Sequence, residues 1–319
     1  MTWFDGFESG RFEVNGTEIF ARCGGDRNKP ALLLLHGFPQ THAIWHRVAQ
    51  QLARDYFLVL PDLRGYGDSA KAPGLPDHAN YSKRTMAQDM VQLMAQLGAS
   101  SFFLCGHDRG GRVAHRLALD HPQRVKKLCV IDIAPTLDMY NATDMTFARA
   151  YYHWFHLIQP APLPETMIGA NAKMYLHAKL GGWRIDDPHA DAAPEGRSGL
   201  GAARRPSAGL SCIEPQALAE YERCFCRAES IHAACEDYRA SAGIDLEHDR
   251  ASREQGDKIA CDLLVLWGQR GLIEKMFKPL ALWQEQCAGH VSGQALPSGH
   301  FIPEELHRET ADALWSFFR

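Results

Sequence analysis

The sequence contains no long apolar run and no long run of basic residues. Its apolar stretches are short, such as residues 31–35, whereas a helix that spans a bilayer takes about 20 residues. Residues 1–10 include Asp5 and Glu8 and lack the basic start and the apolar stretch of a secretory signal. The formal net charge of -4 gives no electrostatic footprint for nucleic acid. We therefore expect no membrane or nucleic-acid partner, and a cytoplasmic location.

Paired CxxC motifs are also absent from the sequence. The nine cysteines are scattered and odd in number, which is typical of reduced and mostly buried thiols. One segment holds Cys224, Cys226, His232 and Cys235, so a zinc site has to be considered there. Their spacing matches no usual pattern of zinc ligands. We expect no metal and no cofactor.

Short apolar runs without alternation recur along the chain and predict buried strands in a sheet that is covered on both faces. Ahead of them, two half-apolar runs flank Asn15-Gly16, a pair that favours a hairpin because both positions tolerate positive φ. Helical patterns separate the runs, so we expect an α/β fold with a mainly parallel sheet. The predicted strands lie at residues 31–35, 57–61, 102–105, 128–133 and 263–267.

Three helices of the core have clear sequence patterns. Ser82 can cap a helix whose methionines and leucines recur at helical spacing, and Gly98 ends it. Residues 109–120 form a second helix. The last helix is predicted at roughly 304–318, where we expect Leu306, Leu314, Trp315 and Phe318 to be buried.

The alternation of strands and helices stops between residues 137 and 255. This stretch has aromatic clusters, prolines and helical patterns, but no convincing parallel strand. We interpret it as a helical cap inserted into an α/β core that comprises residues 1–136 and 256–319. Within the cap, residues 184–209 are rich in Gly, Ala, Pro and Arg and have no periodicity, which predicts a mobile surface loop.

A predicted strand runs directly into Gly106-His107-Asp108-Arg109-Gly110 and then into a predicted helix. In such a turn the glycines permit strained backbone, and the central side chain is lifted above the sheet as a nucleophile. The plainer alternative is that Asp108 caps the helix, because Asp is a favoured N-cap residue. Companion motifs elsewhere in the chain favour the nucleophile.

The first companion motif, residues 36–39 (HGFP), follows the first predicted parallel strand. The combination resembles the α/β-hydrolase fold, where this loop and the residue after the nucleophile each give one backbone N–H to the oxyanion hole. Here the donors would be Phe38 and Arg109. The second motif, residues 298–301 (SGHF), precedes the last helix and provides His300 as the base, which follows the nucleophile in chain order.

The acid that supports this histidine has two possible positions. Many relatives of the fold carry it after the strand at 263–267, but the residue there is Gly271. Asp132 ends another buried strand, and a buried carboxylate needs a partner. Holding the imidazole of His300 in one tautomer provides that partner, so we predict Asp132 as the acid.

A carboxylate nucleophile changes the reaction. Asp108 can displace a leaving group from an sp³ carbon, and water activated by His300 can then hydrolyse the resulting ester, which suits haloalkyl compounds and epoxides. Arg109 and Arg112 share one face of the first helical turn, where two guanidinium groups suit capture of a small carboxylate. The alternative is that these arginines pair with internal acids.

Four segments resemble the haloacetate dehalogenases, including the fluoroacetate dehalogenases: GHDRGGR at 106–112, VIDIAP at 130–135, YYHWF at 151–155 and SGHF at 298–301. The resemblance runs through nearly the whole chain and implies an eight-stranded sheet with a helical cap. It also implies hydrolytic removal of halide from small 2-haloacids. The site residues it implies are Asp108 as nucleophile, Asp132 as acid, His300 as base, Arg109 and Arg112 as carboxylate ligands, and His153, Trp154 and Tyr238 as donors to the halide.

Two other functions stay open at this point. An epoxide hydrolase shares the Asp nucleophile and uses two cap tyrosines, which Tyr151, Tyr152 and Tyr238 would permit. Such enzymes generally have Trp after the nucleophile, where this chain has Arg109, and this favours the dehalogenase. An inactive binding protein on the same fold is the third function. We expect a small anionic halogenated substrate as the partner, and a homodimer on base rates.

Overall fold

The hairpin that opens the chain forms one edge of the sheet. In the computed structural model, which describes residues 3–181 and 209–319, β1 (Phe7–Val14) pairs antiparallel with β2 (Thr17–Gly24). The turn between them has positive φ at both Asn15 (47°) and Gly16 (71°), as a two-residue hairpin turn of this kind requires. The hairpin prediction is confirmed.

All eight strands belong to one sheet, in the order β1-β2-β4-β3-β5-β6-β7-β8. Every neighbouring pair from β4 to β8 is parallel, whereas β1 and β2 run antiparallel, so the predicted eight-stranded, mainly parallel sheet is confirmed. Each predicted apolar run forms a strand. The parallel strands are β3 (Ala31–Leu35), β4 (Phe57–Pro61), β5 (Phe102–His107), β6 (Val125–Ile131), β7 (Asp262–Gly268) and β8 (Val291–Leu296).

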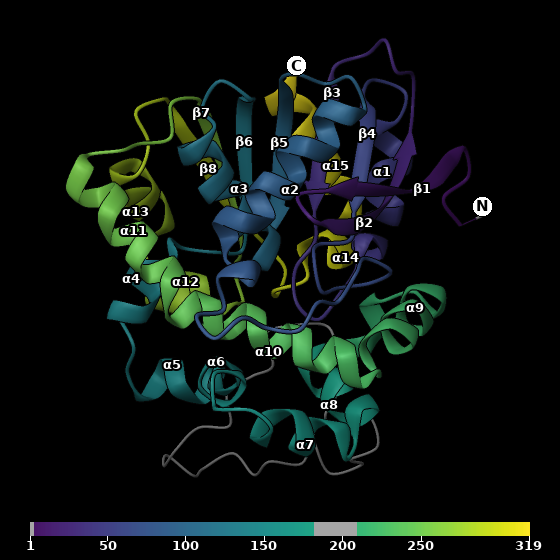
Figure 1. Cartoon of the computed structure of the whole chain (residues 1–319). Helices are drawn as coiled ribbons and strands as arrows, with labels where there is room; N and C mark the ends of the chain where they lie inside the picture. Colours follow the sequence, from purple (N-terminus) through teal and green to yellow (C-terminus); the bar gives the residue numbers. More distant parts are fainter. Residues whose placement is uncertain (1–2, 182–208) are drawn as a thin grey trace, which may run out of the picture.

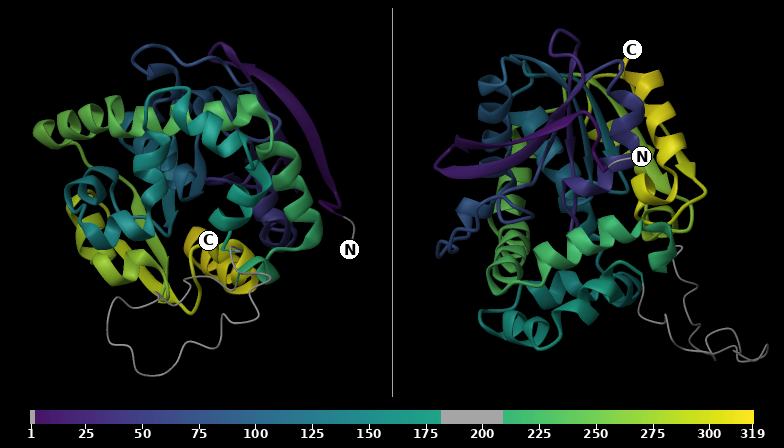
Figure 2. Two further views of the ribbon diagram at one scale, coloured as in Figure 1. Left: turned by 90° about the horizontal axis from the view of Figure 1, so that it is seen from below. Right: turned by 90° about the vertical axis from the view of Figure 1, so that its right-hand side faces the viewer.

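Helices cover both faces of the sheet, which explains why its central strands are apolar without alternation (Figure 2). Along β3, Leu33 and Leu35 belong to the core on one face, and Leu32 and Leu34 to the core on the other. The first face packs against α2 and α3, and the second against α1 and α15. These helices are α1 (His46–Leu52), α2 (Lys83–Gln96), α3 (Arg109–Asp120) and α15 (His307–Phe318).

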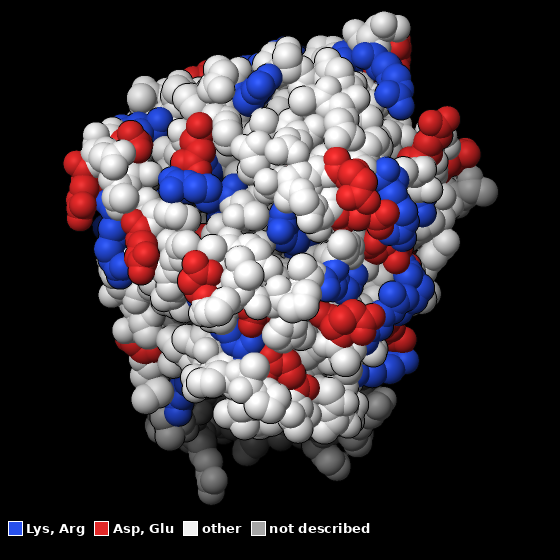
Figure 3. All heavy atoms as spheres, viewed as in Figure 1, with Lys and Arg blue, Asp and Glu red and all other residues white. Residues whose placement is uncertain are grey.

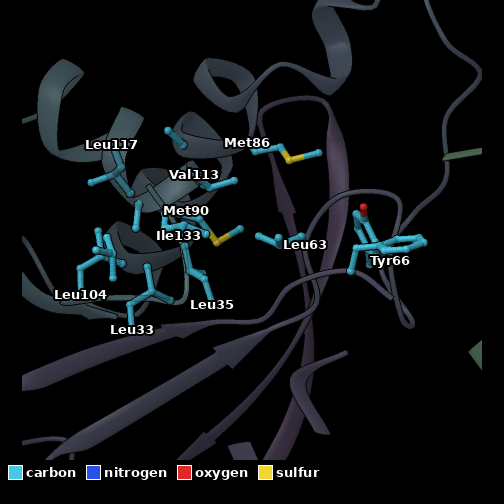
Figure 4. Packing of buried hydrophobic residues seen from close by; sticks show 14 of the residues in the cluster. Leu33, Leu35, Leu63, Tyr66, Met86, Met90, Leu104, Val113, Leu117 and Ile133 are labelled. Atoms are coloured by element: carbon cyan, nitrogen blue, oxygen red, sulfur yellow. The ribbon is translucent and has the colours of Figure 1, made fainter. Parts of the chain in front are cut away.

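The helix that follows the predicted nucleophile is fixed by apolar packing. Val113 of α3 and Met90 of α2 lie beside Leu35 and Ile133 under the elbow (Figure 4). Burying an aliphatic side chain of this size stabilises the fold by roughly 1.5–3 kcal/mol. The start of α3, and with it Asp108, is therefore held on a rigid base.

Between β6 and β7, the described residues 132–181 and 209–261 form helices and no strand. Most of these helices lie below the sheet in Figure 1, with α10 running beneath it. The helices are α4 (Thr136–Asn141), α5 (Met145–Ala150), α6 (Tyr152–Leu157), α7 (Leu163–Gly169), α8 (Ala172–Lys179), η3 (Gly209–Cys212), α9 (Pro215–Phe225), α10 (Ala228–Ala242) and α11 (Ile244–Gln255).

The division into a core and a separate cap at residues 137 and 255 stays a prediction. The predicted mobile loop at 184–209 lies, except for its last residue, outside the described residues. None of the described helices combines the length and the apolar character needed to cross a membrane. On the face seen in Figure 3, basic and acidic side chains are interspersed.

The prediction for the last helix is wrong in two respects. The helix is divided at Leu306 into α14 (Ile302–Glu305) and α15, and Trp315 is 37% exposed. The helix is interrupted at Leu306, whose φ of -137° and ψ of 57° are not helical, and the carboxylate of Glu305 accepts hydrogen bonds from the N–H groups of Gly299 and Phe301. α14 thus belongs to the loop that carries the predicted base. Of the other residues predicted to be buried, Leu314 and Phe318 are buried and Leu306 is partly buried. The remaining short elements are η1 (His42–Trp45), η2 (Ala79–Tyr81), α12 (Leu272–Met276) and α13 (Pro279–Glu285).

Candidate active site

Asp108 stands in a strained turn between β5 and α3. Its φ of 47° and ψ of -116° lie outside the regions that non-glycine residues favour. The turn is close-packed, since a Cβ on Gly110 would lie 2.3 Å from the carbonyl oxygen of His36, and one on Gly106 would lie 2.4 Å from that of Gly110. Asp108 makes no side-chain capping bond to α3. The helix-cap alternative therefore does not account for it.

The loop after β3 supplies a donor to this carboxylate. The backbone N–H of Phe38 donates to Oδ1 of Asp108 at 3.0 Å. A side chain at Gly37 would lie 2.5 Å from Cβ of Asp108, so the loop approaches this closely only with glycine there. Nε2 of His36 accepts the N–H of Leu63 at 3.0 Å and braces the loop from behind. Arg109 begins α3, so its N–H has no acceptor within the helix.

His300 lies between the two predicted carboxylates. Its Nδ1 is 2.5 Å from Oδ2 of Asp132, and its Nε2 is 3.9 Å from Oδ2 of Asp108. Asp132 directly follows β6, has a φ of 51°, and accepts the N–H of Gly268 on its other oxygen at 2.9 Å. This backbone bond fixes the carboxylate, and the carboxylate in turn orients the imidazole with Nε2 toward Asp108. The structure thus brings the three residues together from β5, β6 and the loop after β8.

Gly271 lies beside this acid. A Cβ built on it would be 3.5 Å from Oδ1 of Asp132. A carboxylate from position 271 and the one from Asp132 would therefore enter the same small space. This proximity shows how Asp132 can provide the predicted acid in a chain whose residue at position 271 has no side chain.

The protein environment shifts the pKa values of Asp108 and His300 in opposite directions. Burial raises the pKa of Asp108, but the charges of His300, Arg112 and Arg109 outweigh it, so the pKa is lowered from its ordinary value. For His300, burial lowers the pKa, but the hydrogen bond and charge of Asp132, with the charge of Asp108, leave it raised. At neutral pH the carboxylate is ionised, as a nucleophile must be.

The sequence prediction overlooked His107 as a contributor to the site. Its Nε2 donates to the backbone carbonyl of His300 at 2.8 Å, and its Nδ1 is buried without a partner. Burial, with the charge of His300, lowers the pKa of His107 to about 3, so the ring stays neutral. The residue before the predicted nucleophile thereby connects the elbow to the loop of the predicted base. It stands inside the elbow motif, and that position was the available signal.

Arg109 pairs with an internal acid in this structure, which was the alternative considered for both arginines, and its role as a carboxylate ligand stays a prediction. Its Nε and Nη2 donate to the two carboxylate oxygens of Asp237 at 2.8 and 2.7 Å, and it is fully buried. Asp237 also accepts from Tyr66 at 2.6 Å and from Lys83. Most donors of Arg109 are thus engaged inside the protein. Asp237 precedes Tyr238 on α10, but its pairing across 128 residues had no local signal.

Arg112 is different, because no carboxylate within the described residues pairs with it. Its Nη1 donates to Thr136 Oγ1 at 2.9 Å, and its Nε is buried without a partner. The guanidinium lies 4.8 Å from the ring centroid of Trp154. Burial lowers the pKa of Arg112, against the charge of Asp108. An anion would therefore find an incompletely paired cation here, next to the nucleophile.

A cavity of about 320 Å³ opens onto Asp108 and His300. The three predicted halide donors, His153, Trp154 and Tyr238, all line it, whereas Arg109 and Arg112 do not. Nδ1 of His153 is buried without a partner, and burial lowers the pKa of this ring well below its ordinary value. Tyr151 and Tyr152, which were named for the epoxide hydrolase alternative, line the cavity as well, together with Arg149 and Lys179, which the sequence prediction did not place here.

The cysteine-rich segment does not assemble into one cluster. Among residues 3–181 and 209–319, the one group with closely spaced ligand atoms is Asp68, Glu220 and Cys224. Cys226, His232 and Cys235 are not part of it. Arg223 already pairs with both acids of that group.

Comparison with known proteins gives the family of the chain. A family model described as alpha/beta hydrolase fold matches residues 30–305. The chain is 42% identical to a fluoroacetate dehalogenase from Burkholderia sp, over 98% of this chain and 94% of the relative. It is 29% identical to a soluble epoxide hydrolase from Corynebacterium sp. (strain C12), over 90% and 89% of the two chains. A crystal structure from Nostoc sp PCC 7120, described by its fold as an alpha/beta hydrolase, superposes with a TM-score of 0.89 at 49% identity, covering 99% of both chains.

Proposed function

Because this chain belongs to the haloacetate dehalogenase family of the α/β-hydrolase fold, and is a hydrolase of carbon–halide bonds, we propose that it converts small 2-haloacids to 2-hydroxy acids. The observation that carries the proposal is the geometry at Asp108. An ionised carboxylate, rather than a serine hydroxyl, stands on the elbow within reach of an oriented histidine. Fluoroacetate and chloroacetate are the substrates we propose first.

The first step is a displacement at the carbon that bears the halogen. Oδ2 of Asp108 attacks this carbon, the carbon–halogen bond breaks, and the halide leaves with the bonding electrons. The product is an ester between the substrate carbon and Asp108. Oδ1 of Asp108 stays on the N–H of Phe38, so Oδ2 is the oxygen free to attack.

The second step hydrolyses this ester. Nε2 of His300 takes a proton from water, the hydroxide attacks Cγ of Asp108, and the hydroxy acid leaves with the oxygen that attacked in the first step. Negative charge develops on Oδ1, where the N–H of Phe38 already donates and the N–H of Arg109 is available. Asp132 stabilises the imidazolium, and loss of one proton to solvent completes the cycle.

Arg112 is the proposed ligand of the substrate carboxylate. Among residues 3–181 and 209–319, its buried guanidinium beside Asp108 has no carboxylate partner, whereas Arg109 is paired with Asp237. Arg112 does not line the cavity in this structure, so binding requires its side chain to turn toward the substrate. Arg109 then acts mainly through its backbone N–H and its fixed charge.

His153, Trp154 and Tyr238 are the proposed donors to the departing halide. All three line the cavity together with Asp108, and each can offer one N–H or O–H. Fluoride is small and strongly hydrated in water, so its release depends most on such donors. We propose these roles together with the role of Asp108 as the nucleophile.

Epoxide hydrolysis is the second candidate, and the cavity itself supports it. Tyr151 and Tyr238 both line the cavity with Asp108, and two tyrosines could polarise an epoxide oxygen. The similarity to a soluble epoxide hydrolase points the same way. The unpaired Arg112 favours the anionic substrate, because an epoxide brings no charge to compensate it.

A single product assay separates these functions. The protein is incubated with fluoroacetate, chloroacetate and styrene oxide in parallel, and halide, hydroxy acid and diol are measured. The proposal expects halide and hydroxy acid in equal amounts from a haloacid. Diol without halide would establish the epoxide hydrolase instead, and the absence of every product would favour an inactive scaffold.

A further inference from the structure

Two cations that line the cavity have no part in the proposed reaction. They are Lys179, near the end of α8, and Arg149 on α5. The segments that carry them lie outside the elbow, the oxyanion loop and the loop of the base. Both cations line the same cavity as Asp108.

Lys179 lacks an acidic partner within the described residues. Its Nζ lies 3.8 Å from the ring centroid of Tyr152 and 5.8 Å from that of Tyr175, both neutral groups. Burial lowers the pKa of Lys179 to about 8. The pKa of His153 is lowered mainly by burial and, second, by the charge of Lys179. A half-buried ammonium of this kind is stabilised by an anion.

The nearby Lys173 shows how a lysine on the same helix is normally satisfied. Its Nζ donates to a carboxylate oxygen of Glu222 at 2.8 Å, and its side chain is 62% exposed. The same carboxylate group also pairs with His177 at 2.7 Å. Lys179, one turn and a half further along α8, faces the cavity instead.

The cavity is also larger than a haloacetate requires. At about 320 Å³ it reaches the lower end of the range that encloses drug-sized ligands, roughly 300–1,000 Å³. A two-carbon acid would leave most of this volume empty. A longer acid would fill it and would extend beyond the groups that hold the reacting carbon.

We propose that Lys179 forms a distal anion subsite, and that the preferred substrates are 2-halodicarboxylates. One carboxylate lies next to the reacting carbon, and the second, at the far end of the chain, pairs with Lys179. This inference rests on the proposed function, because it assigns the substrate class of the same site. It does not change the chemistry at Asp108.

The kinetic test compares two substrates that differ only at the far end. These are 2-chloropentanedioate and 2-chloropentanoate, and the measure is the ratio of their kcat/KM values. We expect the native enzyme to favour the diacid by about tenfold, the effect of one charge-assisted hydrogen bond, and Lys179→Met to remove that preference. Lys173→Met, which removes the same charge from the same helix, should keep it.

Several outcomes would overturn the subsite. These are a native ratio of one or less, a ratio that Lys179→Met leaves intact, or an equal loss in Lys173→Met. If Lys179→Met lowers kcat/KM equally for both substrates, Lys179 acts on the shared carboxylate or on anion entry, and the distal subsite is again wrong.

Binding of unreactive acids separates this inference from the proposed function. Calorimetry measures the Kd of pentanedioate and pentanoate for the native protein, Lys179→Met and Lys173→Met. The subsite predicts tighter binding of the diacid, lost only in Lys179→Met, even if no haloacid releases halide. Equal binding of both acids by the native protein would contradict the subsite, whereas failure of halide release from chloroacetate would contradict the proposed function alone.

Discussion

Replacing Asp132 by Asn tests how the acid supports the base. The amide oxygen can still accept the N–H of Gly268, now 2.9 Å from Oδ1, so the local backbone keeps its hydrogen bond. The amide nitrogen then faces Nδ1 of His300, where the carboxylate oxygen stands at 2.5 Å. Because both groups would be donors, the imidazole must take the tautomer with its proton on Nε2. In that tautomer it cannot accept a proton from water.

The expected loss of turnover is large. A wrong tautomer at a hydrolase triad lowers kcat roughly 10³- to 10⁴-fold, about 4 to 5.5 kcal/mol of activation free energy. Displacement by Asp108 needs no base, so one equivalent of halide should still appear rapidly. Stopped-flow halide detection and intact-protein mass spectrometry with chloroacetate measure the burst and the ester. A loss smaller than tenfold, or a loss without any accumulated ester, would refute the assignment of Asp132.

An acid introduced at position 271 could replace the lost carboxylate of the Asp132→Asn variant. Its backbone is extended, with φ of -80°, and a Cβ there would lie 3.5 Å from Oδ1 of residue 132 and 3.1 Å from the carbonyl oxygen of Gly268. The double variant Asp132→Asn with Gly271→Asp should therefore regain part of the lost kcat. Gly271→Asn in the same background restores the volume without the charge and should regain none.

Four further outcomes follow from the site. His300→Ala should trap the ester on Asp108, whereas Asp108→Ala should form none and show no turnover, both by mass spectrometry. The pKa of His300 is raised, so this base becomes neutral only above that pKa, and steady-state turnover should rise with pH through a midpoint above 6.5. The halide burst depends on ionised Asp108, whose pKa is lowered, so the burst should persist at pH 5. A parallel loss of turnover and burst at low pH would contradict the two assignments. Arg109→Met leaves buried Asp237 partly unpaired and should lower the free energy of unfolding by about 3–5 kcal/mol in urea titrations. Arg112→Met should chiefly raise KM for haloacids and should leave stability closer to native.

Much of the fold could be predicted because its signals are local. Unbroken apolar runs identified the buried strands, and the pair Asn15-Gly16 identified the hairpin. β8 had no comparable run, because most of its side chains are partly exposed at the sheet edge. The break in the last helix lies at Leu306, whose backbone is not helical, and helical periodicity does not reveal it.

The candidate site also has features that a local sequence signal predicts and features that it does not. Asp108 and His300 stand in short motifs, and the glycine at 271 pointed to Asp132, so their juxtaposition could be predicted. The roles of the arginines could not, because Asp237 reaches Arg109 from α10, and sequence spacing does not tell which cation finds an internal partner. Lys179 was missed for the same reason, since only the fold shows that it faces the cavity rather than an acid.

The central claim is that Asp108 itself supplies the oxygen of the first product molecule. A single turnover of enzyme in excess over chloroacetate, run in water enriched in ¹⁸O, measures this directly. The account predicts hydroxy acid without ¹⁸O and one ¹⁸O in the peptide that contains Asp108. Labelled hydroxy acid, with an unlabelled Asp108, would show that water attacks the substrate directly and would contradict the account.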